Sequence, residues 1–223
     1  MADEAVRARV PAWDVATRLF HWSLMALIVF AWWSVENHHL DWHKTAGSAV
    51  AGLLVFRLWW GFFGGSTARF GDFLRGPKAL AAYLFGRGDK GRPSLGHNPL
   101  GGLSVIALLL TCIAVVGFGL FAVDTDGLES GPLSFLVDYD QGRLASKLHD
   151  YAFQVLEALV VLHLLAIAFY TFVKRQPLVD AMLDGRKPAE DGKTPLKPAS
   201  FFALLFGLAL GAATTYVLIK MGS

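Results

Sequence analysis

Histidines are the residues of this chain whose type and spacing could do chemistry. Four of the seven lie in or at the ends of long apolar segments. His21 (RLFHW) and His43 (DWHKTAG) stand near the starts of the first and second segments, whereas His149 (KLHDY) and His163 (VLHLL) share the fourth. Imidazole is a common metal ligand, and an ionisable side chain inside a bilayer needs a partner in the protein interior. We therefore treat these four histidines as candidate ligands.

The apolar segments that carry them are long enough to cross a membrane. Hydrophobic residues make up 54% of the chain and charged residues 17%, which is typical of an integral membrane protein. A spanning helix needs about 20 apolar residues, and five segments qualify, at about 19–35, 45–63, 103–123, 149–173 and 201–219. None alternates with period 2, and backbone polar groups must be paired in lipid, so all should be helices. We predict an all-α integral membrane protein, a four-helix transmembrane bundle plus a fifth C-terminal transmembrane helix.

The segments between these helices leave no room for a separate soluble domain. The longest connections, 63–102 and 174–200, are rich in Gly, Pro and charge, which is typical of interfacial loops. We therefore predict one membrane domain over residues 1–187, followed by a linker and the additional helix over 188–223. The first 14 residues lack the apolar core of a secretory signal, so we expect no cleavage there.

Basic residues predict the orientation of the helices. Of the 20 lysines and arginines, 15 lie in residues 1–18, 63–102 and 174–200, which the five spans place on one side. The other side holds Lys44, Arg143, Lys147 and Lys220. The positive-inside rule therefore predicts a cytoplasmic N-terminus and a periplasmic C-terminus.

The four histidines then fall at two depths. His149 and His163 are fourteen residues apart, about 21 Å along a helix and on nearly the same face. His43 matches the depth of His149 near the outer face, and His21 matches that of His163 near the cytoplasmic face. We predict two bis-histidine sites, in which haem between facing helices would give six-coordinate, electron-carrying iron.

Haem is favoured over a bare metal ion because the pairs are far apart and no carboxylate or thiol ligand stands beside them. The single cysteine, Cys112, excludes a CxxCH covalent haem attachment and an intramolecular disulfide. Small residues that could admit a macrocycle are Gly47, Gly52, Gly101, Gly102, Gly117 and Gly119. Two alternatives remain: histidines that are merely polar residues at the headgroup level, and a haem-free transporter or scaffold whose histidines bind protons or a divalent metal.

Other polar residues are secondary candidates. Arg18 and Lys44 flank predicted ligands, and Arg57 lies near the depth of the cytoplasmic site, so each could contact a haem propionate; Arg57 could equally extend to the headgroups. His97, in GHNPLGG, could hydrogen-bond a propionate or a quinone, or simply begin the third span. Glu157 lies between the two histidines of the fourth span, and belongs either to a proton path or to a contact with a neighbouring helix.

Five stretches resemble, in order, the bacterial cytochrome b561 family, and in particular its nickel–iron-hydrogenase-type b subunits. They are VPAWDVATRLFHW, HKTAGSAVAGLLVFRLWWGFFG, GHNPLGG, LHDYAFQVLEALVVLH and AMLDGRK, within residues 10–187. The resemblance implies two haem b groups, with the histidines of the first, second and fourth spans as axial ligands. These are His21, His43, His149 and His163. The fifth span has no counterpart in the four-span family core.

The predicted function is electron transfer across a bacterial inner membrane. The leading interpretation is a conduit between a periplasmic redox protein, such as a c-type cytochrome, a hydrogenase or another dehydrogenase, and the quinone pool. The alternative is a stand-alone oxidoreductase that passes electrons from superoxide or another small molecule to quinone. Eight acids in the predicted outer segments would repel an anion and attract a basic protein. They are Glu36, Asp41, Asp124, Asp126, Glu129, Asp138, Asp140 and Asp150.

Overall fold

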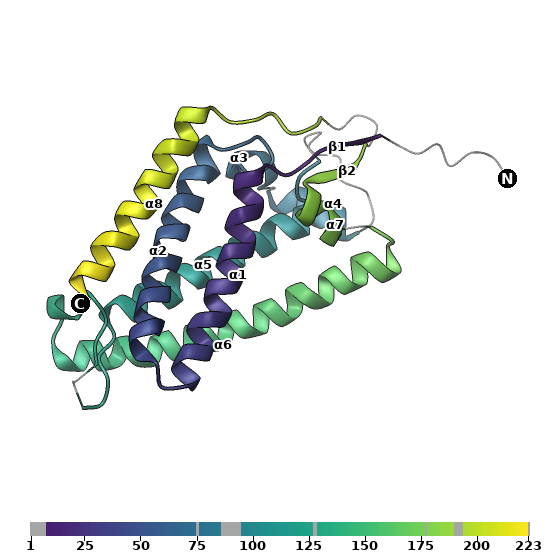
Figure 1. Cartoon of the computed structure of the whole chain (residues 1–223). Helices are drawn as coiled ribbons and strands as arrows, with labels where there is room; N and C mark the ends of the chain where they lie inside the picture. Colours follow the sequence, from purple (N-terminus) through teal and green to yellow (C-terminus); the bar gives the residue numbers. More distant parts are fainter. Residues whose placement is uncertain are drawn as a thin grey trace. The chain divides into compact units, whose positions relative to one another are not determined.

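A computed structural model describes residues 8–74, 76–85, 95–126, 129–176, 178–189 and 194–222 of the chain (Figure 1). Six of the 15 basic residues that predict the orientation lie outside the described residues. They are Arg7, Arg75, Arg87, Lys90, Arg92 and Lys193.

Five long helices carry the fold, and the prediction of an all-α membrane protein is confirmed. They are α1 (Val15–Glu36), α2 (Leu40–Phe63), α5 (Pro99–Phe121), α6 (Tyr139–Ala168) and α8 (Phe201–Met221). Each is long and apolar enough to cross a membrane. A π-helical turn, η2 (Phe169–Val173), continues α6.

Most of the long helices begin several residues before the predicted apolar segments, because polar caps start them. Asp14 caps α1 by accepting the backbone N–H of Thr17 at 2.6 Å. At the start of α6, Asp138 and Gln141 form a reciprocal capping pair, with backbone-to-side-chain distances of 2.8 and 3.2 Å. The first ten residues of α6 are largely polar, so the predicted apolar segment includes only the later part of the helix.

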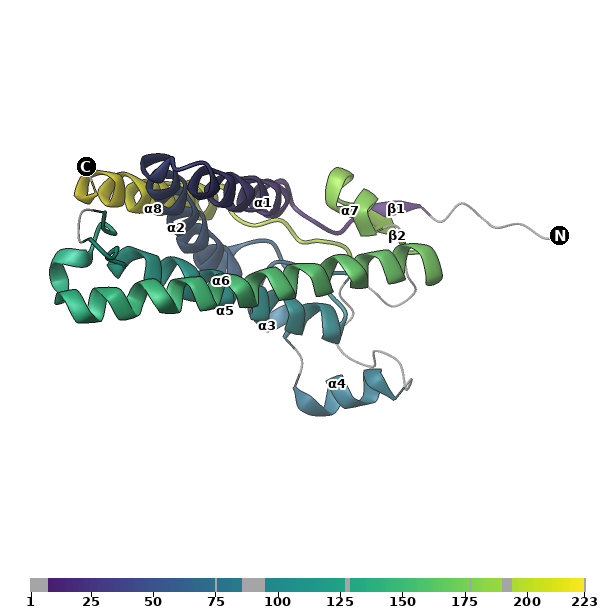
Figure 2. The same cartoon turned by 90° about the horizontal axis from the view of Figure 1, so that it is seen from below.

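The chain divides into two compact units. The first comprises residues 1–19, 59–106 and 162–204. It contains the short helices α3 (Phe70–Phe73), α4 (Pro77–Leu84) and α7 (Leu178–Asp184), so the connections predicted as loops are partly helical. Strands β1 (Arg9–Pro11) and β2 (Arg186–Pro188) pair antiparallel with Val10 opposite Lys187, and lie beside α7 in both views (Figure 2). Ala12, Trp13, Leu95 and Ala181 form a small buried core beneath them.

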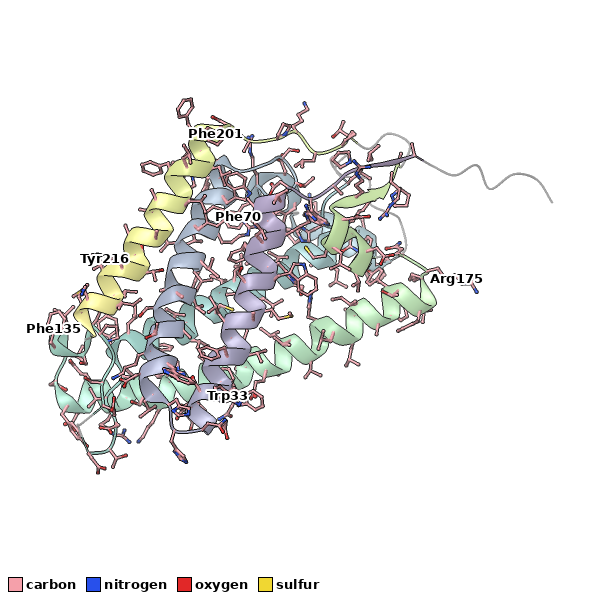
Figure 3. All side chains as sticks on the ribbon, in the orientation of Figure 1. Trp33, Phe70, Phe135, Arg175, Phe201 and Tyr216 are labelled. Atoms are coloured by element: carbon pink, nitrogen blue, oxygen red, sulfur yellow. The ribbon has the colours of Figure 1, made fainter. Side chains whose placement is uncertain are left out.

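The second unit comprises residues 20–58, 107–161 and 205–223. In it α8 packs closely on α2, since a Cβ at Gly52 would lie 2.5 Å from the Gly211 carbonyl oxygen. Small residues at such a crossing are typical of membrane helix pairs. The opposite side of α8 is exposed, and Tyr216, labelled in Figure 3, is 64% exposed. The fifth helix is therefore packed on the bundle.

A three-residue turn joins α1 to α2. His38 adopts φ 60°, a left-handed conformation, while its N–H donates to Val35 and that of His39 donates to Ser34. This is the hydrogen-bond pattern of a Schellman helix end. The turn brings His43, in the first turn of α2, back beside the last part of α1.

Candidate functional site

His43 of α2 and His149 of α6 meet within the second unit. Their ring centroids are 5.9 Å apart and the ring planes are nearly perpendicular, at 87°. With a metal–nitrogen distance of about 2 Å on each side, plus the radius of each ring, two imidazoles bound to opposite faces of one metal have centroids about 6 Å apart. The observed spacing fits that requirement.

Backbone carbonyl groups orient both rings. Nδ1 of His43 lies 2.9 Å from the Ala31 carbonyl oxygen of α1, and Nδ1 of His149 lies 2.7 Å from that of Val115 of α5. A carbonyl oxygen only accepts hydrogen bonds, so each Nδ1 must carry the proton. The lone pair of each ring is therefore on Nε2, the tautomer that a metal-ligating histidine needs, and such contacts raise ligand basicity.

A cavity of about 320 Å³ lies beside this pair, entirely within the second unit. Apolar side chains make up most of its wall, together with Gly47, Gly119 and both imidazoles. A Cβ at Gly119 would lie 2.9 Å from His149 Nδ1, whereas one at Gly47 would meet nothing within 4 Å. Glycine at 119 thus permits the ring to approach α5, and glycine at 47 leaves the cavity open.

Other glycines predicted to admit a macrocycle have different surroundings. Gly52 lies in the α2–α8 contact, and a Cβ at Gly102 would lie 2.9 Å from the Phe73 carbonyl oxygen. One at Gly101 would lie 3.1 Å from Asn98 Oδ1, which accepts the Gly101 N–H at the start of α5. These three serve helix packing and helix initiation, because they contact protein on the side where a Cβ would stand. Gly117 has open space there.

Lys44 lines the same cavity and forms an ion pair. Its Nζ lies 2.8 Å from Glu129 and 3.5 Å from Asp41. Glu129 and Asp124 also line the cavity, so its polar part has mixed charge. Lys44, predicted as a propionate contact, is therefore already paired with a carboxylate of the chain.

His21 and Arg57 also belong to the second unit. The His21 ring packs edge-on against Trp22 with centroids 5.1 Å apart. Arg57 is 3% exposed, and its guanidinium carbon lies 6.0 Å from the centroid of the Phe20 ring. A buried guanidinium suits a role inside the bundle better than extension to the headgroups. His163 belongs to the first unit, so its predicted pairing with His21 remains a prediction.

Arg18 and His97 serve the first unit. The Arg18 guanidinium donates to the Leu183 carbonyl group at the end of α7. The His97 ring lies between Trp13 and Phe73, with centroid distances of 4.6 and 4.9 Å. Both contacts tie short segments together, which favours the structural interpretation of His97 over a ligand contact.

The carbonyls of Ala31 and Val115 and the Lys44–Glu129 pair had no distinguishing sequence signal. Backbone acceptors are present at every residue, and only the helix arrangement selects which of them meets a ring. Gly119 did carry a signal, as a small residue in an apolar span, although its contact with a ligand ring could not be predicted.

Comparison with known families gives one match. The family model described as prokaryotic cytochrome b561 matches residues 12–185, most of the chain, and ends before α8. No curated protein and no solved structure matches the chain. A multi-pass helical membrane protein with two anchored imidazoles beside a cavity fits that family. The chain therefore belongs to the prokaryotic cytochrome b561 family and is a b-type membrane cytochrome that acts in electron transfer.

Proposed function

We propose that this protein holds two b haems and carries electrons between a periplasmic redox protein and the membrane quinone pool. The observation that carries the proposal is the His43–His149 pair, in which both Nδ1 atoms meet backbone carbonyl oxygens and the centroids are 5.9 Å apart. Haem bound there would supply reversible one-electron iron chemistry.

The residues of the His43–His149 site have different roles. His43 and His149 would supply Nε2 ligands, while the carbonyls of Ala31 and Val115 fix their tautomers. Gly47 and Gly119 leave room beside the rings. The predominantly apolar wall would limit the access of water to a bound group and so help to set its potential. Among the described residues, no three His, Cys, Asp or Glu side chains gather to hold a bare metal ion.

The second site rests on the sequence. We assign His21 and His163 as its ligands because they match in predicted depth, and Arg57 as a charged neighbour because it is buried. Two sites about 21 Å apart along α6 would lead electrons from one face of the membrane toward the other. Quinone would react near the cytoplasmic site.

The experiment is a reduced-minus-oxidised spectrum with a pyridine haemochrome assay on the purified protein. We expect two haem b per chain, and one after His43→Ala or His163→Ala. His39→Ala, in the α1–α2 turn, is the matched control and should retain both. A single haem in the unaltered protein that His163→Ala does not remove would reject the second site, and a colourless protein would reject the proposal and favour the transporter alternative.

A protein partner is favoured over superoxide by charge. The predicted periplasmic segments carry eight carboxylates against four basic side chains, and the Lys44–Glu129 pair involves one of each. Such a field attracts a basic protein and repels a small anion. Fast quinone reduction by superoxide, without any protein donor, would reverse this preference.

A further inference from the structure

Two polar residues of α6 lie exposed at hydrocarbon depth. Gln154 and Glu157 fall within the apolar segment 149–173, and Glu157 is four residues, or about 6 Å, from its midpoint. In the described part of the chain neither side chain has a hydrogen-bond or ion-pair partner. Ionisable residues at this depth are costly in lipid and almost always face protein or water. This surface of α6 therefore needs a covering partner.

The spacing of the exposed polar residues defines a helix-pairing surface. Lys147, Asp150, Gln154, Glu157 and Val161 follow one another at intervals of three, four, three and four, and all five are exposed. We call them the α6 seam. This is the a/d spacing of helices that pack in parallel with a slight left-handed crossing. Leu156, which is 2% exposed, lies about 160° around the helix from Gln154, so Gln154 lies away from the buried side, whereas Asp150 also borders the cavity beside His149.

We propose that the α6 seam is the contact between two copies of this chain, related by a two-fold axis along the membrane normal. Copies in one membrane share their orientation, so two α6 helices would run parallel and each seam residue would meet its own counterpart. An amide has both donors and an acceptor, so Gln154 can pair with Gln154 of the second copy.

The polar and charged residues of the α6 seam also favour a second copy of this chain as its partner. A two-fold axis places the two Lys147 side chains opposite each other and likewise the two Asp150 side chains, but because these positions are successive, each Lys147 is also next to Asp150 of the second copy. The Gln154 amide of one copy can also donate to a Glu157 carboxylate oxygen of the other. A second copy therefore offers Gln154 a hydrogen-bond partner and gives each Lys147 a neighbouring acid.

Disulfide cross-linking in native membranes tests the contact independently of haem. In a Cys112→Ala background, Gln154→Cys lies in the seam, while Val155→Cys, also exposed and one residue further along the helix, lies outside it. We expect the oxidised dimer band of Gln154→Cys to exceed that of Val155→Cys by about tenfold. Equal bands, or no dimer from Gln154→Cys, would overturn the proposal, as would a cross-link that forms only with a different protein.

Substitutions without cysteine provide the second measurement. In lipid nanodiscs, Gln154→Leu with Glu157→Leu should weaken self-association by about tenfold, because both interhelical hydrogen bonds are lost. Glu157→Gln keeps an oxygen that can accept from Gln154 of the second copy and should retain the dimer. A dimer unaffected by the double leucine variant would place the contact elsewhere and overturn the assignment of the seam.

Discussion

Gly119 is the residue at which the His149 ring meets α5. A methyl group there would lie 2.9 Å from Nδ1 and 3.0 Å from Cε1 of the ring, so Gly119→Ala should push the imidazole away from the Val115 carbonyl. Loss of such an orienting contact typically lowers metal affinity about 10–100-fold. We expect Gly119→Ala to lose the haem assigned to His43 and His149, measured as haem per chain during titration of the apoprotein.

Gly117 provides the control on the same helix. A Cβ at Gly117 meets nothing within 4 Å, so Gly117→Ala should bind haem as the unaltered protein does. If both alanine variants lose haem equally, the effect belongs to α5 in general and the contact with His149 is not its cause.

The Lys44–Glu129 pair should tune the redox potential more than the stability. The two side chains are 27% and 43% exposed, so breaking the pair should cost only about 0.5 kcal/mol of unfolding free energy. Glu129 nevertheless lines the cavity beside the histidines, and a negative charge there favours oxidised iron. Glu129→Gln should raise one midpoint potential, and Lys44→Gln should lower it, each on the order of tens of millivolts. Redox titration checks both, and shifts of the same sign would contradict this electrostatic account.

At the scale of the elements, the α2–α8 crossing determines how the fifth helix is held. A Cβ at Gly211 would lie 2.8 Å from the Gly52 carbonyl oxygen and 3.3 Å from Phe56 Cβ. Gly211→Leu should therefore separate the helices and cost about 1–3 kcal/mol, as overpacking usually does. Thermal unfolding in detergent measures this loss. Ala213→Leu, on the exposed side of α8, should leave the midpoint unchanged; an equal loss there would mean that α8 tolerates no added bulk on any side.

The long helices were predictable from the sequence, and their starts were not. The length of an apolar segment indicates only the part of a helix that lies in hydrocarbon. The predicted span 149–173 therefore lacked the first ten residues of α6, which begins after its cap, Asp138. The short pair β1–β2 escaped prediction because three-residue strands carry no periodicity. The packing of α8 on α2 could not be predicted, because small residues such as Gly207 and Gly211 occur both in contacts within a helix bundle and in contacts with a partner protein.

The candidate site was also only partly predictable from the sequence. His43 and His149 were predicted as a pair from depth and spacing, and they lie together. Their carbonyl partners and the Lys44–Glu129 pair depend on how α1, α2, α5 and α6 pack, which one sequence does not encode in residue types. For His97 the residue type alone was misleading. It suggested a ligand contact, whereas the ring is packed between Trp13 and Phe73.

At the scale of the whole molecule, charge separates the two predicted sides of the membrane. Fifteen of the 20 basic residues lie in the predicted cytoplasmic segments, whereas the periplasmic segments carry an excess of acids. By the positive-inside rule, the first distribution should retain those segments in the cytoplasm, and the second should give the predicted periplasmic surface a negative field. The predicted orientation and the predicted choice of partner therefore both depend on how charge is distributed along the chain. The effect of charge on the partner can be tested by itself.

The field predicts how electron delivery responds to salt. Attraction between exposed charges weakens as the Debye length falls from about 10 Å at 0.1 M to about 3 Å at 1 M ionic strength. We expect the rate of reduction by a basic c-type cytochrome to fall by at least about tenfold over that range, whereas an acidic c-type cytochrome should react slowly at low salt and gain from screening. Stopped-flow spectroscopy of the protein in nanodiscs follows both donors. Asp124→Asn with Asp126→Asn should flatten the salt dependence for the basic donor, because it removes two of the eight carboxylates of the predicted periplasmic segments. A rate that ignores salt for both donors would remove the electrostatic case for a protein partner and return superoxide or another small donor to first place.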